Sequence, residues 1–259
     1  MGRQYIERPL PAPTAHRKPT RPVLLRRLAS HLPVLPSQCA LCRGWDRDRL
    51  CAACRERFGQ RAARCTRCAL RVPAGAPVCG ACLTDPPPYD GALAAVDYGH
   101  PWDQLIGPFK FHGALDLAQP LAAGLADAWR ASGRPLPDAL VPVPLAPARL
   151  RERGYNQAWE IARRVARAIG CKADARLVRR VRDTPHQLAL PPQQRSANVH
   201  AAFAVDPRRA AQLAGRRVAI VDDVMTTGAT AAEMARVLRA AGAAGVEAWV
   251  VARTPAPAG

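Results

Sequence analysis

The most constraining stretch of the chain is residues 218–230, which read Val-Ala-Ile-Val-Asp-Asp-Val-Met-Thr-Thr-Gly-Ala-Thr. Four apolar residues, Val218 to Val221, predict a short buried strand, and two adjacent carboxylates stand at its C-terminal end. A turn of small, hydroxylated residues follows, and the Ala-rich segment 231–241 predicts a helix. A strand, a turn rich in backbone N–H groups and a helix N-terminus together predict an anion site.

The acid pair narrows the choice of ligand. Carboxylates beside a phosphate site repel that phosphate unless they bind something else, and sugar hydroxyls and Mg²⁺ are the obvious candidates. Gly228 can adopt a positive φ, which lets the backbone approach a ligand, and three threonines of the turn add hydroxyl donors. A phosphate with a diol a few ångströms away is a ribose 5-phosphate. The alternative is a strand end with an N-capping Asp, which needs only one acid.

The same stretch resembles the phosphoribosyl-diphosphate (PRPP) loop of the type I phosphoribosyltransferases. The resemblance implies that the two acids hold the ribose 2′ and 3′ hydroxyls and that the following loop holds the 5′-phosphate. The residues expected to contact PRPP here are Asp222, Asp223, Val224, Met225, Thr226, Thr227, Gly228, Ala229 and Thr230.

Eight of the 9 cysteines form four C-x-x-C pairs, with 8, 10 and 10 residues between successive pairs. Two such pairs supply four thiolates for the tetrahedral coordination of Zn²⁺, so eight sulfurs predict two structural zinc ions. The simplest assignment joins the first two pairs and the last two, and an interleaved assignment also agrees with the sequence. The pairs are Cys39/Cys42, Cys51/Cys54, Cys65/Cys68 and Cys79/Cys82.

A disulfide scaffold and a redox dithiol are the alternatives for these cysteines. Disulfides need an oxidising compartment, and residues 1–30 show no apolar run or cleavage pattern of a signal peptide. A redox function does not explain four tandem pairs. Few large apolar residues separate the pairs, so this segment is expected to fold only with metal bound. Because free thiolates persist in the cytoplasm, we expect a cytoplasmic protein.

The formal net charge of +18 is unevenly distributed. Residues 1–85 contain 16 Lys and Arg against 5 Asp and Glu, which predicts a polyanion partner such as single-stranded DNA. Trp45 and Phe58 offer stacking faces for unpaired bases. The alternative is a compositional bias towards Arg, Ala, Pro and Gly. Apolar runs are too short to cross a membrane. The arginines between the cysteine pairs are Arg43, Arg47, Arg49, Arg55, Arg57, Arg61, Arg64, Arg67 and Arg71.

Three domains are expected along the chain: a basic, largely disordered arm at 1–35, a double zinc ribbon at 36–84 and an α/β domain at 90–254. In the last of these, predicted strands alternate with predicted helices, which favours a mainly parallel sheet with flanking helices. Segments 147–153 and 182–198 are interpreted as loops. The predicted strands are 91–98, 139–143, 216–221 and 246–252, and the helices are 102–109, 116–131, 155–169 and 231–241.

Three further groups of residues are candidates for ligand contact. Residues 149–157 combine three arginines with Tyr-Asn-Gln near a predicted strand end, which suits a diphosphate, although an exposed basic loop that caps the next helix fits as well. Lys110 is a candidate phosphate contact. The segment 186–199 carries Arg, Asn and Gln side chains that suit a closing loop, or else a solvated linker.

Together these motifs resemble the ComF family, the competence-type phosphoribosyltransferase-like proteins with a double zinc ribbon. His112 departs from the family's usual aromatic or basic residue. The resemblance implies a type I phosphoribosyltransferase-like fold, a role in DNA uptake during natural transformation, and competence-machinery proteins as partners. The matching segments are the cysteine pairs at 39–82, 110–113, 141–144, 153–157, 195–199 and 221–230.

These expectations lead to a hypothesis for phosphoribosyl transfer. Asp222 and Asp223 would hold the ribose hydroxyls, Mg²⁺ would bridge hydroxyls and diphosphate, and Arg153, with Lys110, would neutralise the leaving diphosphate. The sequence does not identify the acceptor, so turnover stays open. Two other hypotheses remain: a single-stranded nucleic-acid-binding module in which the fold is a sensor or scaffold, and a purine-responsive regulator.

Overall fold

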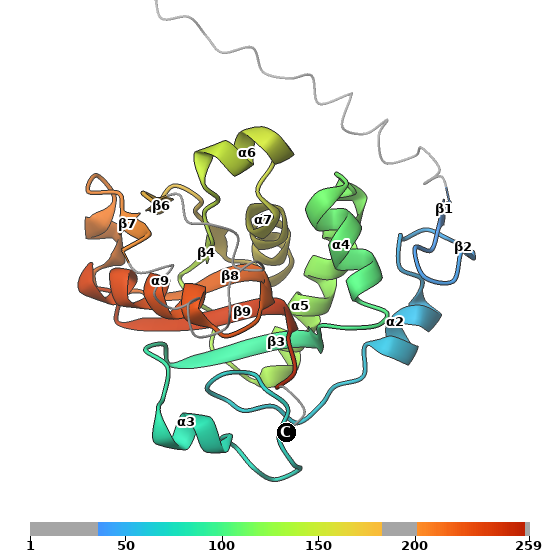
Figure 1. The fold of residues 1–259 in the computed structure, drawn as a ribbon, viewed down its shortest axis with the longest axis horizontal. Coiled ribbons are helices and arrows are strands. Elements are labelled where there is room, and N and C mark those ends of the chain that lie inside the picture. Colours follow the sequence, from blue (N-terminus) through green and yellow to red (C-terminus); the bar gives the residue numbers. More distant parts are fainter. Residues whose placement is uncertain (1–35, 183–200, 257–259) are drawn as a thin grey trace, which may run out of the picture. The chain divides into compact units, whose positions relative to one another are not determined.

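The computed structural model describes residues 36–182 and 201–256. Its centre is a five-stranded sheet in the order β3-β9-β8-β4-β5, and all of its strand pairs are parallel (Figure 1). This topology confirms the α/β fold with a mainly parallel sheet. The strands are β3 (Gly91–Asp97), β4 (Ala139–Pro142), β5 (Lys172–Ala173), β8 (Arg217–Met225) and β9 (Gly245–Arg253).

Helices cover both faces of the sheet. Helices α5 (Ala118–Ser132) and α7 (Gln157–Ile169) pack on one face, and α9 (Ala229–Ala240) packs on the other. Alternate residues of the central strands enter the two cores, so Val221 joins the α5–α7 side and Ile220 joins the α9 side. Burial on both faces explains the continuous apolar run of β8, because such strands have no solvent face.

Shorter elements surround this sheet. Helix α4 (Asp103–Phe111), the 3₁₀ turn η1 (Leu115–Leu117) and helix α6 (Pro147–Arg153) connect the strands. Strands β6 (Val178–Arg180) and β7 (Phe203–Val205) form an antiparallel pair, and η3 (Ala210–Leu213) precedes β8. The cysteine-rich segment contains β1 (Ser37–Gln38), β2 (Trp45–Asp46), α2 (Ala52–Phe58) and α3 (Gly80–Thr84).

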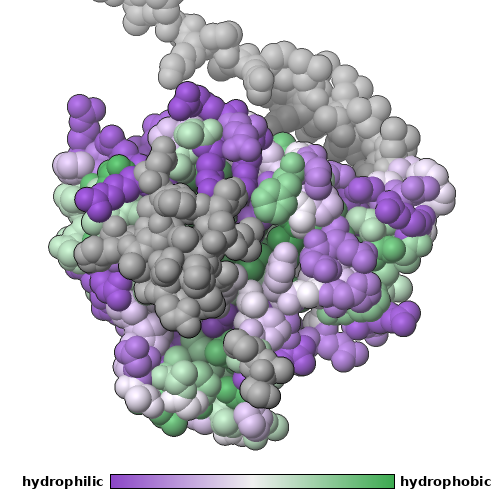
Figure 2. All heavy atoms as spheres, viewed as in Figure 1, coloured by the Kyte–Doolittle hydropathy of each residue, from purple (hydrophilic) through white to green (hydrophobic). Residues whose placement is uncertain are grey.

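Two of the predicted elements were wrong in type or extent. The segment 147–153, expected to be a loop, is helix α6, which begins with Pro147 at a first-turn position and ends at Gly154 in the left-handed conformation. It buries none of its residues, so apolar periodicity cannot reveal it. Figure 2 shows the hydrophilic surface over α6. Strand β8 continues through Met225, so the acid pair lies within it.

The cysteine-rich segment packs on the α/β part at two places. Beside α4, Trp102 Nε1 donates a hydrogen bond to the Phe58 carbonyl at 3.1 Å. Along the edge strand β3, the Ala92 N–H donates to the Thr66 carbonyl at 3.0 Å, and Arg64 pairs with Asp97 at 2.6 Å. The second contact covers the open edge of the sheet, which would otherwise expose unpaired backbone groups.

Some expectations fall outside the described residues: the arm at 1–35, most of the loop at 182–198, and the candidate closing loop at 186–199. In the part of the chain that the structure describes, no helix has the length and apolar character needed to cross a membrane.

Candidate functional site

A cavity of about 220 Å³ lies at the C-terminal edge of the sheet. It is lined by the acid pair of β8, by residues 224–231 and by four cationic side chains. The carboxyl ends of parallel strands and the N-terminus of a following helix meet at such an edge, which is where α/β proteins bind ligands. The structure therefore brings the predicted PRPP-contact residues into one place. The cationic residues are Lys110, Arg149, Arg153 and Arg180.

Lys110 and the acid pair form the polar centre of this cavity. Lys110 stands in the last turn of α4, and its Nζ lies 3.0 Å from Asp223 Oδ1. The same oxygen accepts a hydrogen bond from the Val224 N–H at 2.7 Å. Asp223 is buried, whereas Asp222 is half-buried and lines the cavity. Asp222 is thus the carboxylate without a cationic partner among the described residues.

The crowding of the two acids changes their protonation. Burial and the adjacent Asp223 carboxylate raise the pKa of Asp222 from its ordinary value to about 7. Burial lowers the pKa of Lys110, but the charges of Asp223 and Asp222 outweigh burial and hold that pKa above its usual value. At neutral pH the cavity therefore holds a charged lysine and an aspartate near its own midpoint. Perturbed groups of this kind are common in functional sites.

The hydroxyl-rich turn joins β8 to α9 as the sequence predicts. Gly228 is the N-cap residue with a φ of 84°, a conformation that glycine adopts most easily. The Thr227 hydroxyl accepts a hydrogen bond from the Ala229 N–H at 3.3 Å. The first N–H groups of a helix have no partner inside the helix and carry a partial positive charge, so this end of α9 favours an anion.

Tyr155, Asn156 and Gln157 make hydrogen bonds to the backbone, and Asn156 caps the next helix as the alternative interpretation of this segment expected, while Asn156 and Gln157 also line the cavity. The Tyr155 hydroxyl donates to the Phe109 carbonyl, and Gln157 Nε2 donates to the Lys110 carbonyl at 3.1 Å. Asn156 caps α7 by accepting from the Trp159 N–H at 3.2 Å, and its Nδ2 donates to the Val143 carbonyl at 3.0 Å. This segment therefore fixes the end of α4 that carries Lys110.

Arg153 is the one residue of segment 153–157 with a cationic group in the cavity. Its guanidinium lies 5.1 Å from the centroid of the Phe111 ring, a distance typical of cation–π contacts. Phe111 is exposed and lines the cavity too. The contact with Phe111 therefore helps to hold the Arg153 guanidinium at the wall of the cavity.

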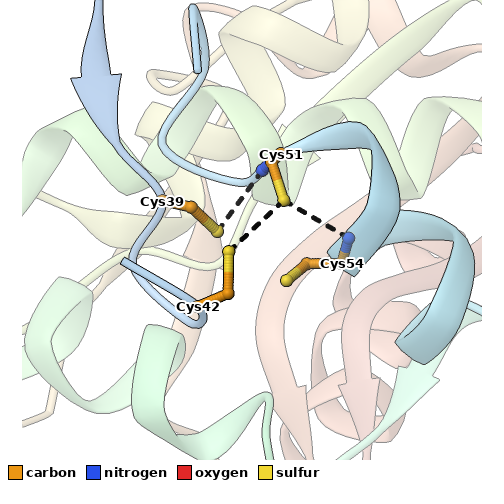
Figure 3. Close-up of side chains that lie close together, drawn as sticks. All are labelled: Cys39, Cys42, Cys51 and Cys54. Atoms are coloured by element: carbon orange, nitrogen blue, oxygen red, sulfur yellow. Dashed lines mark hydrogen bonds between the residues drawn. The ribbon is translucent and has the colours of Figure 1, made fainter. Parts of the chain in front are cut away.

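The eight paired cysteines form two clusters of four. The first cluster is Cys39, Cys42, Cys51 and Cys54, and the second is Cys65, Cys68, Cys79 and Cys82. In each, the sulfur atoms all lie within 4.8 Å of one another. The consecutive assignment is therefore confirmed, and the interleaved one is excluded. Figure 3 shows the first cluster, in which the four side chains point towards one centre.

The spacing of the sulfurs fits a tetrahedral zinc ion. Zn–S bonds of about 2.3 Å place the sulfurs of a tetrahedron about 3.8 Å apart. The measured Sγ–Sγ distance is 3.7 Å for Cys42 and Cys51 and 3.6 Å for Cys68 and Cys79. Backbone N–H groups of Cys51 and Cys54 point at Cys39 and Cys51 sulfurs, each at 3.4 Å. Such donors stabilise thiolates around a metal.

One thiol in each cluster has a lowered pKa. Burial raises the pKa of Cys39, but N–H groups of Cys51, Cys42 and Leu41 outweigh burial and bring the pKa to about 6. Cys65 is lowered in the same way to about 7. Each cluster thus contains a thiol that loses its proton near neutral pH, which favours metal binding.

Several residues around the cavity were missed from the sequence. Tyr98, Phe111 and Arg180 line it, although none of them belongs to the predicted PRPP-contact set. Arg149, which also lines it, belongs to the segment 149–157 that was a candidate for diphosphate contact. Tyr98 and Arg180 follow or end short strands, and no local pattern marks them as ligand-facing. A search for aromatic or basic residues at the C-terminal ends of predicted strands would have found Tyr98.

Comparison with known proteins agrees with this geometry. The family model of the phosphoribosyl transferase domain matches residues 156–259. The DNA utilization protein YhgH of Salmonella typhi is 37% identical over 232 residues, which are 85% of this chain and 98% of that protein. Competence protein F of Haemophilus influenzae is 33% identical over 223 residues, 83% and 96% of the two chains.

A solved structure, the glutamine PRPP amidotransferase from B. subtilis with ADP and GMP, is 19% identical with a TM-score of 0.36. The match covers 52% of this chain and 27% of that chain.

The parallel sheet and the matched domain model make this a protein with a phosphoribosyl transferase domain. The resemblance seen in the sequence is confirmed over most of the chain. The protein belongs to the ComF/YhgH family.

Proposed function

We propose that this protein binds PRPP together with Mg²⁺ in the cavity at the C-terminal edge of the sheet and acts in DNA uptake. The observation that carries the proposal is the meeting, in one cavity, of the acid pair, the hydroxyl-rich turn of 226–230 and four cationic side chains. The names of the relatives, DNA utilization protein and competence protein, support the role in DNA handling.

Each part of PRPP has a matching group in the cavity. The turn 226–230 and the N-terminus of α9 receive the 5′-phosphate. Asp222, which has no cationic partner among the described residues, receives the ribose hydroxyls and Mg²⁺, because carboxylate oxygens suit that ion. Asp223 keeps Lys110 in place at 3.0 Å. Lys110 and Arg153 face the diphosphate.

We also propose that each cysteine cluster binds one structural Zn²⁺. The sulfur spacing and the N–H donors support this assignment, as do the acidic thiols Cys39 and Cys65. The ribbon segment 36–84 and the α/β part 90–254 are then two domains, of which only the second carries the PRPP site.

The affinity for PRPP and Mg²⁺ is expected to depend on pH through Asp222. Its pKa of about 7 lies above that of a free aspartate, so the ligand-binding anion forms as the pH rises through 7. Affinity should increase about tenfold per pH unit below 7 and level off above it. Titration calorimetry from pH 5.5 to 8.5 measures this dependence.

Asp222→Asn is the control for that titration. PRPP itself ionises in the same range, so the informative quantity is the affinity ratio of the two proteins, which should grow with pH and then become constant. An affinity ratio that is the same at every pH from 5.5 to 8.5 would show that Asp222 does not bind the ligand. Absence of PRPP binding at every pH in the folded, zinc-loaded protein contradicts the proposed function.

A second function, single-stranded DNA binding by the first ribbon, is favoured by one observation. Trp45 on β2 is 71% exposed, which leaves its face open for a base. Arg43 and Arg47 stand on either side of it in the sequence and have no ion pair in the described part of the chain. Arg49 is engaged with Asp116 at 2.6 Å.

Trp45→Ala is expected to weaken binding of a single-stranded oligothymidine about tenfold, since one stacked base contributes about 1–3 kcal/mol. Fluorescence anisotropy at several salt concentrations measures the affinity. Arg43→Gln with Arg47→Gln should lower the slope of log affinity against log salt by about 1.4. Leu83→Ala, at a side chain that is 73% exposed on the second ribbon, is the control and should bind normally. Equal affinity of the Trp45 variant and wild type would exclude this surface.

A further inference from the structure

Arg253, the last residue of β9, is a buried cation that joins the second cysteine cluster to the hydroxyl-rich turn. It is 5% exposed. Its Nε donates to the Cys68 carbonyl at 2.9 Å, and its Nη1 donates to the Met225 carbonyl at 3.0 Å and to the Thr226 carbonyl. One guanidinium therefore holds a metal-cluster residue on one side and the start of the turn on the other.

A buried guanidinium needs partners for its charge. Among the described residues Arg253 has no carboxylate partner, and carbonyl oxygens accept its bonds. A divalent ion held by four thiolates keeps a net negative charge, so the metal-loaded second cluster supplies the missing countercharge beside Cys68. The position of Arg253 is thus stabilised by the cluster in its metal-bound form.

Tyr89 makes a second link between the same two regions. It follows the second cluster directly along the chain and is 3% exposed. Its hydroxyl lies 3.8 Å from Met225 Sδ, and a Cβ built on Gly228 would lie 3.1 Å from that hydroxyl. Tyr89 therefore packs behind the turn, and it belongs to the same buried core as Ala69, the residue that follows Cys68.

We infer that Arg253 is a positioning residue through which the second cysteine cluster, when it holds metal, sets the conformation of the turn 225–228. The inference rests on the proposed function for the identity of the ligand, whereas the coupling between cluster and turn stands apart from it. The first cluster packs beside α4, and within residues 36–182 and 201–256 it makes no hydrogen bond or ion pair with the turn. Loss of metal from the second cluster would therefore loosen the turn, and loss from the first would not.

Arg134 provides a matched comparison because it binds the loop around the pair Cys65/Cys68 at the opposite end of the sheet. Its Nη2 donates to the Thr66 carbonyl at 3.2 Å and to the Ala92 carbonyl at 3.0 Å, and its Nη1 pairs with Glu247 at 3.0 Å. Thr66 and Cys68 belong to one loop, yet Arg134 does not contact the turn. A variant at Arg134 thus tests docking of the ribbon without the link to the turn.

Hydrogen exchange of the amides at 224–230 is the measurement, with PRPP affinity as the second readout. Arg253→Lys keeps the charge but cannot bond several carbonyls at once, so turn exchange should rise at least about tenfold and PRPP affinity should fall about tenfold. Arg134→Lys should change both by less than about twofold. Cys79→Ser should act like the Arg253 variant on the turn, and Cys42→Ser should not.

Zinc content and circular dichroism establish that each variant is folded. If Arg253→Lys fails to fold, wild type with and without a zinc-specific chelator provides the same exchange comparison at the turn. Unchanged exchange at 224–230 after loss of second-cluster metal, or equal effects of the Arg253 and Arg134 variants, would overturn the inference. Failure of wild type to bind PRPP would instead refute the proposed ligand and leave the exchange result decisive for the coupling.

Discussion

Replacing Asp222 and Asp223 together with Asn is expected to weaken binding of PRPP in the presence of Mg²⁺ at least about 100-fold. Hydrogen bonds to a charged group contribute about 1.5–3 kcal/mol each, and every 1.4 kcal/mol is about tenfold in the dissociation constant. Without Mg²⁺ the same carboxylates repel the ligand's phosphates, so the difference between variant and wild type should shrink. Calorimetry with and without Mg²⁺ measures both effects.

The stability of the Asp222→Asn variant separates lost function from lost folding. The pKa of Asp222 is about 7 in the folded chain, above the value of about 3.9 for an unfolded aspartate. The folded state thus binds more protons, and this group's contribution to the free energy of unfolding falls as pH rises from about 4 to 7. An Asn side chain does not titrate, so the variant lacks this decrease in the free energy of unfolding. The single variant should therefore unfold no more easily than wild type at pH 8. Denaturant titration checks this.

Asp90→Asn with Asp138→Asn is the matched control for the double variant. These carboxylates lie just before β3 and β4, at the opposite end of the sheet, and their removal changes the net charge equally. The control should keep its PRPP affinity even if it loses stability, because Asp138 accepts the Arg217 N–H and Asp90 accepts the Val246 N–H. Equal loss of affinity in both double variants would show that net charge, and not the site, governs binding.

Local chemistry made the centre of the site predictable from sequence. The order of an apolar strand, two acids, a hydroxyl-rich turn and a helix leaves few arrangements, and the structure has β8, the turn and α9 in that order. The extent of β8 was missed because Asp222 and Asp223 interrupt the apolar run. Asp222 and Val224 stay in the strand because they pair with Val250 and Ala252 of β9, a partnership that local sequence does not encode.

Long-range partners explain the contacts that the sequence could not reveal. Tyr155 and Gln157 looked like ligand-binding side chains because nothing nearby in sequence satisfies them. Their acceptors, the carbonyls of Phe109 and Lys110, lie more than forty residues away along the chain. Arg253 lies just beyond the predicted strand 246–252 and was not singled out, and its link to Cys68 joins residues 185 positions apart. Buried polar groups need partners, but sequence does not say which ones.

The cysteine clusters were the easier prediction, because their chemistry is local. Two C-x-x-C pairs at short separation define a tetrathiolate whatever the surrounding fold. The sequence left open which C-x-x-C pairs come together, and packing decides between the alternatives. Cys39 and Cys54 join the core beside α4, whereas Cys65, Cys68 and Cys82 form a separate cluster.

Removal of both zinc ions is expected to unfold the segment 36–84 while the sheet keeps its strands. Regular structure in this segment is limited to two short strands, a 7-residue helix and a 5-residue helix, too little for an independent core. Structural zinc sites contribute about 10–16 kcal/mol of apparent binding free energy, comparable to the whole stability of a domain. Trypsin should then cut after Arg57, Arg61 or Arg67 at least about 100-fold faster once a chelator is present.

The zinc content of cysteine variants tests whether zinc loss causes the faster cleavage by trypsin. Wild type should hold two zinc ions per chain, and Cys39→Ser and Cys65→Ser should each hold one, because each removes a buried ligand of a different cluster. Cys171→Ser is the control: its thiol lies outside both clusters, so it should keep two ions and resist trypsin. Chelator-independent cleavage, or full metal content in both cluster variants, would mean that the cysteines are not held by zinc. Cleavage confined to 36–84 would show that the sheet folds on its own, with the ribbon as a metal-dependent attachment to β3 and α4.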